Sequence, residues 1–232
     1  MYLINNIKRL LKTFYPREIK NFNNSQIILD ARKLNFTLIS ELQNVLDNHT
    51  KTFSPEIFSN GSDQRWYHVK KQDPAIFDEI LISSGVLETI KDELIDYEYI
   101  VLYNHIVASG KNSGSGDGYH LDSTFYQRKL IYYLTDANTE NGCFQYIPGT
   151  GSLNLISNYI IKNIFKKNIL RVDNSKVKNK KKIDVIKDKG NGFLIRTSMF
   201  HRGNPLIKGE RKAITFYLFK KNNFPKNLNK YL

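Results

Sequence analysis

The hydrophobic and polar positions of this chain change their period near residue 97. Before that point, apolar residues recur every three or four positions over residues 4–14, with basic residues on the other face, as is typical of an amphipathic helix. A second helix is expected over residues 36–48, beginning near the turn-prone Asn35. A third should begin at Pro74, which suits a first helical position, with helical continuation over residues 88–95. The pattern predicts a helical part over residues 1–96.

From residue 97 onward the pattern is typical of β-strands. Apolar runs rich in Tyr, Ile, Val and Leu, separated by Gly-rich or turn-rich joints, occupy residues 97–107, 129–134, 143–147, 182–186, 193–196 and 212–219. Many short strands with such joints favour a sandwich or a barrel. We therefore expect an α+β, mainly β fold, in which N-terminal helices pack against a β core spanning residues 97–220.

Length and composition point to one globular domain over residues 1–232. The chain has 41% hydrophobic and 25% charged residues, close to the averages of globular proteins. It contains no apolar run of about 18 residues, so no transmembrane segment is expected. Cys143 is the single cysteine, which excludes an intramolecular disulfide and a thiolate zinc site. A reducing, cytoplasmic location follows as the expectation.

The positive charge is concentrated in one segment. The net charge is +13, and residues 162–189 hold eleven basic and three acidic residues, a local excess of 11 − 3 = +8. We interpret this segment as a Lys-rich insertion in the β core, suited to an anionic substrate or to peripheral contact with anionic surfaces rather than to nucleic acid. The alternative function is a basic module that binds nucleic acid or anionic surfaces on the same β scaffold.

Three residues have the composition of a metal site. His120 and Asp122 are two positions apart, so in an extended segment their side chains point to the same side. A third ligand has to come from a distant strand, and His201 is suitable because it follows the apolar run 193–195 and precedes a turn. Two histidines and one carboxylate leave three coordination positions open, which suits non-haem Fe(II) working with O₂. A zinc hydrolase with the same ligands is a weaker alternative, because no HExxH motif supplies a general base.

Arg211 is the candidate cosubstrate anchor. It lies ten residues after His201, at the start of the apolar run 213–218. If residues 208–210 form the turn, Arg211 returns beside the metal on the neighbouring strand. Its guanidinium can grip a carboxylate with two parallel hydrogen bonds. It would hold the far end of a dicarboxylate whose 2-oxo acid end chelates iron.

Other residues are weaker candidates. Tyr132 and Tyr133 are neighbours on one strand, so only one can face the interior, where its hydroxyl would support the same dicarboxylate; packing of both in the core is the plainer interpretation. Asn104 and His105 are also neighbours on one strand, so only one of them can face the interior. A polar and aromatic cluster at residues 63–68 would line a substrate mouth.

Four ordered motifs within residues 97–220 resemble the phytanoyl-CoA dioxygenase family of Fe(II)/2-oxoglutarate oxygenases. They are Tyr119-His120-Leu121-Asp122, Leu134-Thr135-Asp136-Ala137-Asn138-Thr139-Glu140-Asn141-Gly142-Cys143, Ile147-Pro148-Gly149-Thr150, and the closing segment 190–195 with His201, Asn204 and Arg211. Two departures occur, since the family's Pro-Gly-Ser-His stretch ends in Thr150-Gly151 here and its Gly-Asp pair is Gly190-Asn191.

The resemblance implies a double-stranded β-helix, or jelly roll, and a set of roles. His120, Asp122 and His201 would bind Fe(II), and Arg211 would bind the C5 carboxylate of 2-oxoglutarate, with O₂ as the second cosubstrate. The implied reaction is hydroxylation of an unactivated C–H bond of a small or carrier-linked metabolite, with release of succinate and CO₂. Related oxygenases that halogenate lack the carboxylate ligand, so the presence of Asp122 resembles the hydroxylating branch.

Overall fold

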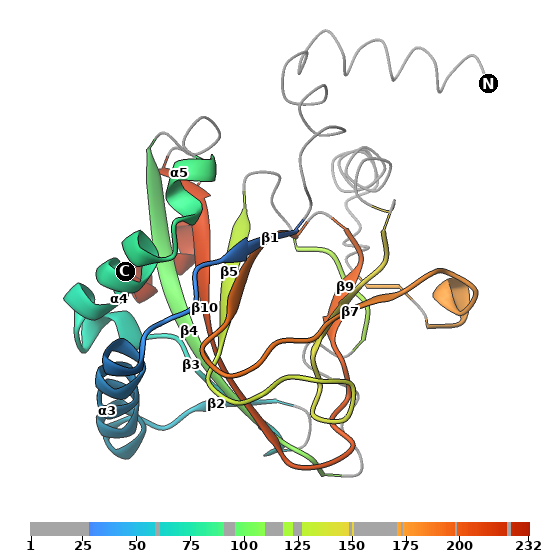
Figure 1. Ribbon diagram of the computed structural model, residues 1–232, viewed down its shortest axis with the longest axis horizontal. Helices are drawn as coiled ribbons and strands as arrows, with labels where there is room; N and C mark the ends of the chain where they lie inside the picture. The colour runs from blue at the N-terminus through green and yellow to red at the C-terminus, as the bar shows by residue number, and fades with distance from the viewer. Residues whose placement is uncertain are drawn as a thin grey trace, which may run out of the picture.

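Two antiparallel β-sheets face each other, and helices cover the outer face of the larger sheet (Figure 1). This computed structural model describes residues 28–58, 61–90, 96–109, 118–122, 127–148, 150, 171–172, 174–197, 199–221 and 224–232. The arrangement confirms the expected α+β, mainly β fold with helices packed against a jelly-roll core.

The larger sheet forms the centre of the molecule. Its seven strands are, in order across the sheet, β1 (Ile28–Ala31), β8 (Gly192–Arg196), β5 (Arg128–Tyr133), β10 (Glu210–Lys220), β4 (Tyr97–Val107), β3 (Asp63–Trp66) and β2 (Glu56–Phe58). Strands β4 and β10 pair along their full lengths of 11 residues each. These long central strands fix the register of the side chains that their inner faces present.

The smaller sheet has three strands in the order β7 (Ile183–Val185), β6 (Phe144–Tyr146) and β9 (His201–Gly203). His120 extends this sheet, because it forms antiparallel bridges with His201 on one side and with Arg171 on the other. The backbone N–H of each of the two histidines donates to the carbonyl of the other, at 3.0 Å in both directions. This pairing places two of the proposed ligands side by side.

Helices α3 (Phe36–Thr52), α4 (Pro74–Ser83) and α5 (Val86–Ile90) lie against the larger sheet (Figure 1). Asn35 caps α3 by accepting from Leu38 N at 2.8 Å, and Asp73 caps α4 in the same way ahead of Pro74. Short 3₁₀ turns occur at η2 (Val69–Lys71), η3 (Asn174–Val177) and η5 (Lys226–Tyr231). None of the described helices is long and apolar enough to cross a membrane.

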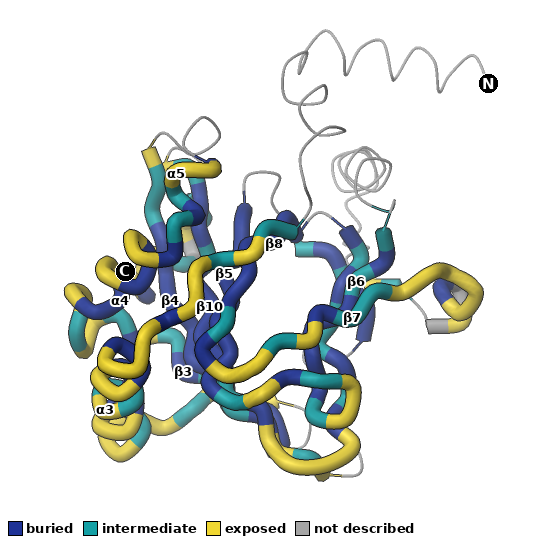
Figure 2. The backbone as a smooth tube through the Cα atoms, viewed as in Figure 1, coloured by how far each residue is buried: buried dark blue, intermediate teal, exposed yellow. Residues whose placement is uncertain are grey.

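Alternation along the strands divides the core into two parts, and the strands between them are buried (Figure 2). One part, between the helices and the larger sheet, includes Leu130, Tyr132 and Phe216. The other, between the two sheets, includes Ile131 and Tyr133 with neighbouring apolar side chains. Odd-numbered positions of β5 and β10 therefore face the space between the sheets.

The part before residue 97 is not purely helical, which corrects the sequence-based expectation. It also supplies β1, β2 and β3, which extend both edges of the larger sheet. Strands β1 and β3 have four residues each and β2 has three, and the sequence of β3 is Asp-Gln-Arg-Trp. Strands of three or four residues are too short to show a hydrophobic alternation in the sequence, and they form through pairing with their neighbours. The helix expected over residues 4–14 lies outside the described residues.

Candidate metal centre

The three proposed metal ligands meet at one point between the sheets. One donor atom each from His120, Asp122 and His201 lies within 4.8 Å of the others. Among the described residues, these three side chains form the one group that could hold a metal ion. Nε2 of His120 is 3.9 Å from Oδ1 of Asp122, and Nε2 of His201 is 3.5 Å from Oδ2. The side chain of His201 is 2% exposed, so the site is closed to water on that side. The spatial convergence that the sequence motifs implied is present.

Backbone carbonyls set the ring orientation of both histidines. Nδ1 of His120 is 2.9 Å from the carbonyl oxygen of Gly118, and Nδ1 of His201 is 2.9 Å from that of Met199. A carbonyl only accepts, so each Nδ1 carries the proton and donates it, which leaves the lone pair on Nε2. Nε2 of His201 is buried without a hydrogen-bond partner among the described residues. An orphaned buried acceptor next to a carboxylate is what a metal ion would satisfy.

The electrostatics keep these groups in the states that bind metals. Burial lowers the pKa of His201 to about 3, even though the Asp122 carboxylate opposes the shift. Burial also lowers the pKa of His120. Burial by itself would raise the pKa of Asp122, but Lys129 and the two imidazoles outweigh it and hold that pKa below its usual range. Near neutral pH the site therefore offers two neutral imidazoles and one carboxylate.

Lys129 is a site residue that sequence reasoning missed. Its Nζ lies 2.8 Å from Oδ2 of Asp122, and its side chain is 10% exposed. Burial disfavours the ammonium form, but the Asp122 carboxylate prevails and raises the pKa of Lys129. Lys129 shares the inner face of β5 with Ile131 and Tyr133. The available signal was that Lys129 alternates with Ile131 and Tyr133, which places the three side chains on one face of the strand.

Arg211 faces the same space, but it does not lie on the strand next to that of His201, as was expected. His201 begins β9 in the smaller sheet, whereas Arg211 lies on β10 of the larger sheet, so the two strands are not neighbours. The arginine reaches the site from the opposite wall. It is 4% exposed, burial lowers its pKa, and among the described residues no side chain forms a hydrogen bond or an ion pair with its guanidinium. A buried cation without a partner is unfavourable until an anion binds it.

Tyr133 lies beside Arg211 and interacts with it electrostatically. The Tyr133 hydroxyl accepts the backbone N–H of Phe144 at 2.8 Å, so its own proton is free to be donated elsewhere. Tyr132 points the other way, into the helix-side core, and donates to the carbonyl of Arg32 at 2.8 Å. Of the two tyrosines, only Tyr133 faces the interior.

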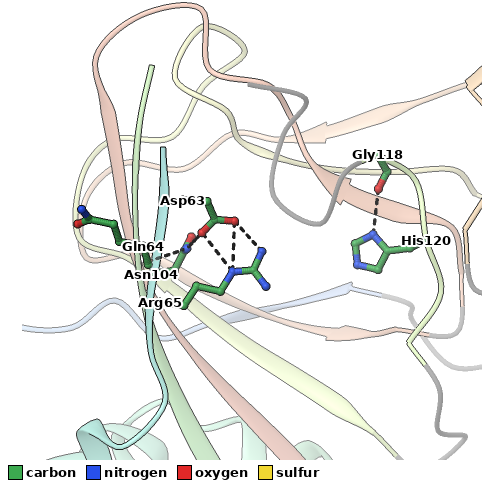
Figure 3. Close-up of polar contacts among 6 residues, drawn as sticks. All are labelled: Asp63, Gln64, Arg65, Asn104, Gly118 and His120. Carbon is green, nitrogen blue, oxygen red and sulfur yellow. Dashed lines mark hydrogen bonds and ion pairs between the residues drawn. The ribbon is translucent and has the colours of Figure 1, made fainter. Parts of the chain in front are cut away.

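A polar cluster lies on the inner face of β3 and β4. Asp63 is fully buried and accepts from Arg65 Nη2 at 2.6 Å and from Asn104 Nδ2. In Figure 3 the Arg65 side chain extends toward the segment that carries His120, while Gln64 points to the other side of the sheet. Arg65 interacts electrostatically with both Lys129 and Arg211, so the cluster belongs to the same space between the sheets.

The metal-free protein is expected to lose stability as the pH falls. In the unfolded chain the pKa of a histidine is 6.5, and that of His201 is about 3 when folded, so between these values the unfolded state binds more protons. The stability that His201 contributes is present above pH 6.5 and is lost as the pH falls toward 3, by up to about 1.4 kcal/mol per pH unit. Urea denaturation at several pH values measures this slope, which should be shallower in His201→Gln. An equal slope in that variant would contradict the assignment.

The profile of one protein family, described as Phytanoyl-CoA dioxygenase (PhyH), matches residues 48–207 of the chain. The matched region contains all three candidate ligands and ends four residues before Arg211. No curated protein is significantly similar to the chain.

Solved structures with the same fold share little sequence with this chain. HygX from Streptomyces hygroscopicus, with nickel and 2-oxoglutarate bound, is 15% identical with a TM-score of 0.60, covering 88% of this chain and 87% of that one. SnoK, a non-haem alpha ketoglutarate dependent carbocyclase from nogalamycin biosynthesis, is 13% identical with a TM-score of 0.61, covering 88% and 83%. AviO1 from Streptomyces viridochromogenes Tue57 is 16% identical with a TM-score of 0.59, covering 90% and 96%. At these identities the similarity confirms the fold.

Proposed function

Because the chain belongs to the phytanoyl-CoA dioxygenase family, we propose that it is an Fe(II)- and 2-oxoglutarate-dependent dioxygenase that hydroxylates an unactivated C–H bond of a small or carrier-linked metabolite. Succinate and CO₂ would be the coproducts. The observation that carries the proposal is the convergence of His120, Asp122 and His201 between the two sheets, with a buried, unpaired Arg211 on the opposite wall. Asp122 supplies the carboxylate that favours hydroxylation over halogenation.

The three residues fit a ferrous ion. His120 and His201 would bind it through Nε2, since their Nδ1 atoms are committed to backbone carbonyls. Asp122 would contribute the anionic oxygen, leaving three positions for a bidentate cosubstrate and O₂. When bound, the iron supplies the oxidation chemistry, and the protein supplies ligation, orientation and exclusion of water. The burial of His201 and its stacking on Phe144, with ring centroids 5.3 Å apart, serve that exclusion.

2-Oxoglutarate suits the space between the two walls. Its 2-oxo acid end would face the ligands on the smaller sheet, and its C5 carboxylate would meet Arg211 on the larger one. Two parallel hydrogen bonds from the guanidinium would satisfy this buried cation. The Tyr133 hydroxyl, which still has a proton to donate, would add a third. Arg211, which has no ion-pair partner among the described residues, would thus gain one in the C5 carboxylate of the cosubstrate.

An anionic substrate fits the charge of this space. Among the described residues, three cations face it, namely Arg65, Lys129 and Arg211, against the two carboxylates Asp63 and Asp122. A ferrous ion and a 2-oxoglutarate dianion together add no net charge, so one positive charge is left over. A small substrate or a carrier-linked one with an anionic group would neutralise it.

The basic insertion supports contact with anionic surfaces in the part that the structure describes. Exposed lysines gather on the loop between η3 and β7, which extends away from the smaller sheet (Figure 2), at positions Lys178, Lys180, Lys181 and Lys182. Most of the remaining insertion, at residues 162–170, lies outside the described residues. A cytoplasmic location is also part of the proposal, since the single Cys143 is buried and unpaired.

The decisive experiment is turnover without substrate. Purified protein supplied with Fe(II), ascorbate and 2-oxoglutarate should release succinate at a slow, measurable rate, because O₂ activation can proceed uncoupled from hydroxylation. Replacing Fe(II) with Zn(II) should stop the release, which distinguishes the proposal from a zinc hydrolase. Absence of succinate from iron-loaded protein would contradict it. A basic binding module would instead show salt-sensitive binding that His120→Ala leaves unchanged.

A further inference from the structure

Lys129 binds neither the metal nor 2-oxoglutarate in the proposed function. It lies on the inner face of β5, with its ammonium group 2.8 Å from Asp122 Oδ2 and 4.9 Å from the centroid of the Tyr217 ring. Asp122 is the only carboxylate among the described residues that forms an ion pair with it. The ammonium group therefore touches the single anionic ligand of the metal centre.

A metal ion bound by Asp122 shares this carboxylate with Lys129. Neither side chain can turn to bulk water, since Lys129 is 10% exposed and Asp122 is 16% exposed. Charges act more strongly on each other at such a site than at the surface, because less water screens them. The positive charge of Lys129 is thus separated from the metal only by the carboxylate of Asp122.

This charge affects the two oxidation states of iron unequally. Fe(III) carries one more positive charge than Fe(II), so repulsion by the ammonium raises the energy of the ferric state more than that of the ferrous state. The ion pair also draws electron density from the Asp122 carboxylate, which makes it a weaker donor to a ferric ion. Both effects favour the ferrous state over the ferric state.

We propose that Lys129 is a positioning residue that holds Asp122 and keeps the bound iron ferrous, by raising the Fe(III)/Fe(II) reduction potential. The inference rests on the proposed function, because it requires iron at His120, Asp122 and His201. In the competing side reaction, Fe(II) loses one electron to become Fe(III), and O₂ takes that electron to become superoxide. Lys129 makes this loss less favourable and so preserves the active ferrous form between turnovers.

The test compares iron-loaded wild type with three variants at position 129. Lys129→Met removes the charge at similar length, Lys129→Gln retains a hydrogen-bond donor without the charge, and Lys129→Arg retains the charge. Lys70→Met is the matched control, because Lys70 is also largely buried, with its ammonium 3.7 Å from the Tyr99 ring, but packs on the helix side of the larger sheet. Melting curves and iron content identify the variants that fold and bind metal.

The readouts are the reduction potential from a mediated titration and the rate at which Fe(III) appears in air, followed by electron paramagnetic resonance. Lys129→Met and Lys129→Gln should oxidise about tenfold faster than wild type, at a lower potential, whereas Lys129→Arg and Lys70→Met should match wild type. Unchanged oxidation in Lys129→Gln, or fast oxidation in Lys129→Arg, would overturn the inference. Wild type that binds no iron or releases no succinate would contradict the proposed function, whereas wild type that does both alongside unaltered variants would refute the role of Lys129 alone.

Discussion

Replacing His201 with alanine is expected to abolish succinate release, lowering it by roughly 1,000-fold or more, since the variant lacks one of three metal ligands. The same loss is expected for His120→Ala and for Asp122→Asn, which keeps the volume of the side chain beside Lys129. The reason is geometric: the three donor atoms lie within 4.8 Å of one another, and two ligands do not hold a labile ferrous ion in place. Binding of Fe(II) measured by calorimetry should fall together with turnover.

His105→Ala is the control for this experiment. His105 lies on β4 with its ring 2.7 Å from a carboxylate oxygen of Glu210, and its strand position directs it away from the space between the sheets. Its removal should leave both iron binding and succinate release near the wild-type level. Full turnover in any of the three ligand variants would reject that residue as a ligand.

Arg211→Met should raise the concentration of 2-oxoglutarate needed for half-maximal turnover by about 100-fold or more. The variant removes a buried cation whose expected partner, the C5 carboxylate, would then be buried without compensation, and breaking such a pair costs several kcal/mol. Metal binding without the cosubstrate should change little, since Arg211 lies on the opposite wall from His120 and His201. Initial rates of succinate release over a range of 2-oxoglutarate concentrations measure the effect.

Lys212→Met is the adjacent control, because Lys212 points away from the site and forms an ion pair with Glu210 at 3.0 Å. It should leave the requirement for 2-oxoglutarate unchanged. Tyr133→Phe should give an intermediate increase, of about tenfold, through the loss of one neutral hydrogen bond. An Arg211→Met enzyme with the wild-type requirement would remove Arg211 from this role.

The sequence predicted which three residues come together better than it predicted how the strands that carry the candidate site are arranged. His120, Asp122 and His201 were identifiable because metal ligation needs particular residue types, and these have few substitutes. The strand that carries Arg211 was predicted, but its placement in the other sheet was not, because the order of strands depends on pairing between distant segments. The β3 strand was missed for the same reason, since its Asp-Gln-Arg-Trp sequence has no periodicity of its own.

Lys129 shows that the direction of a charged side chain is also hard to predict from the sequence. A lysine next to Arg128 in the sequence is ordinarily interpreted as a solvated residue at a strand end, and only the parity of β5 reveals that one side chain faces Ile131 and Tyr133 on the inner wall. The direction of a side chain follows from register, and register is a property of the assembled sheet. The alternation along β5 groups Lys129 with Ile131 and Tyr133, but only the pairing of the strands shows that this face is the inner one.

Under the proposed function, the metal ligands and Arg211 would hold the two ends of one cosubstrate from different sheets. An oxo diacid would chelate the metal at one end and reach the guanidinium at the other, so its carbon chain would have to match the distance between the two. A diacid one methylene shorter would make only one of the two contacts at a time. Selectivity for chain length would then depend on the strand pairing that fixes Arg211 in β10, rather than on contacts along the carbon chain.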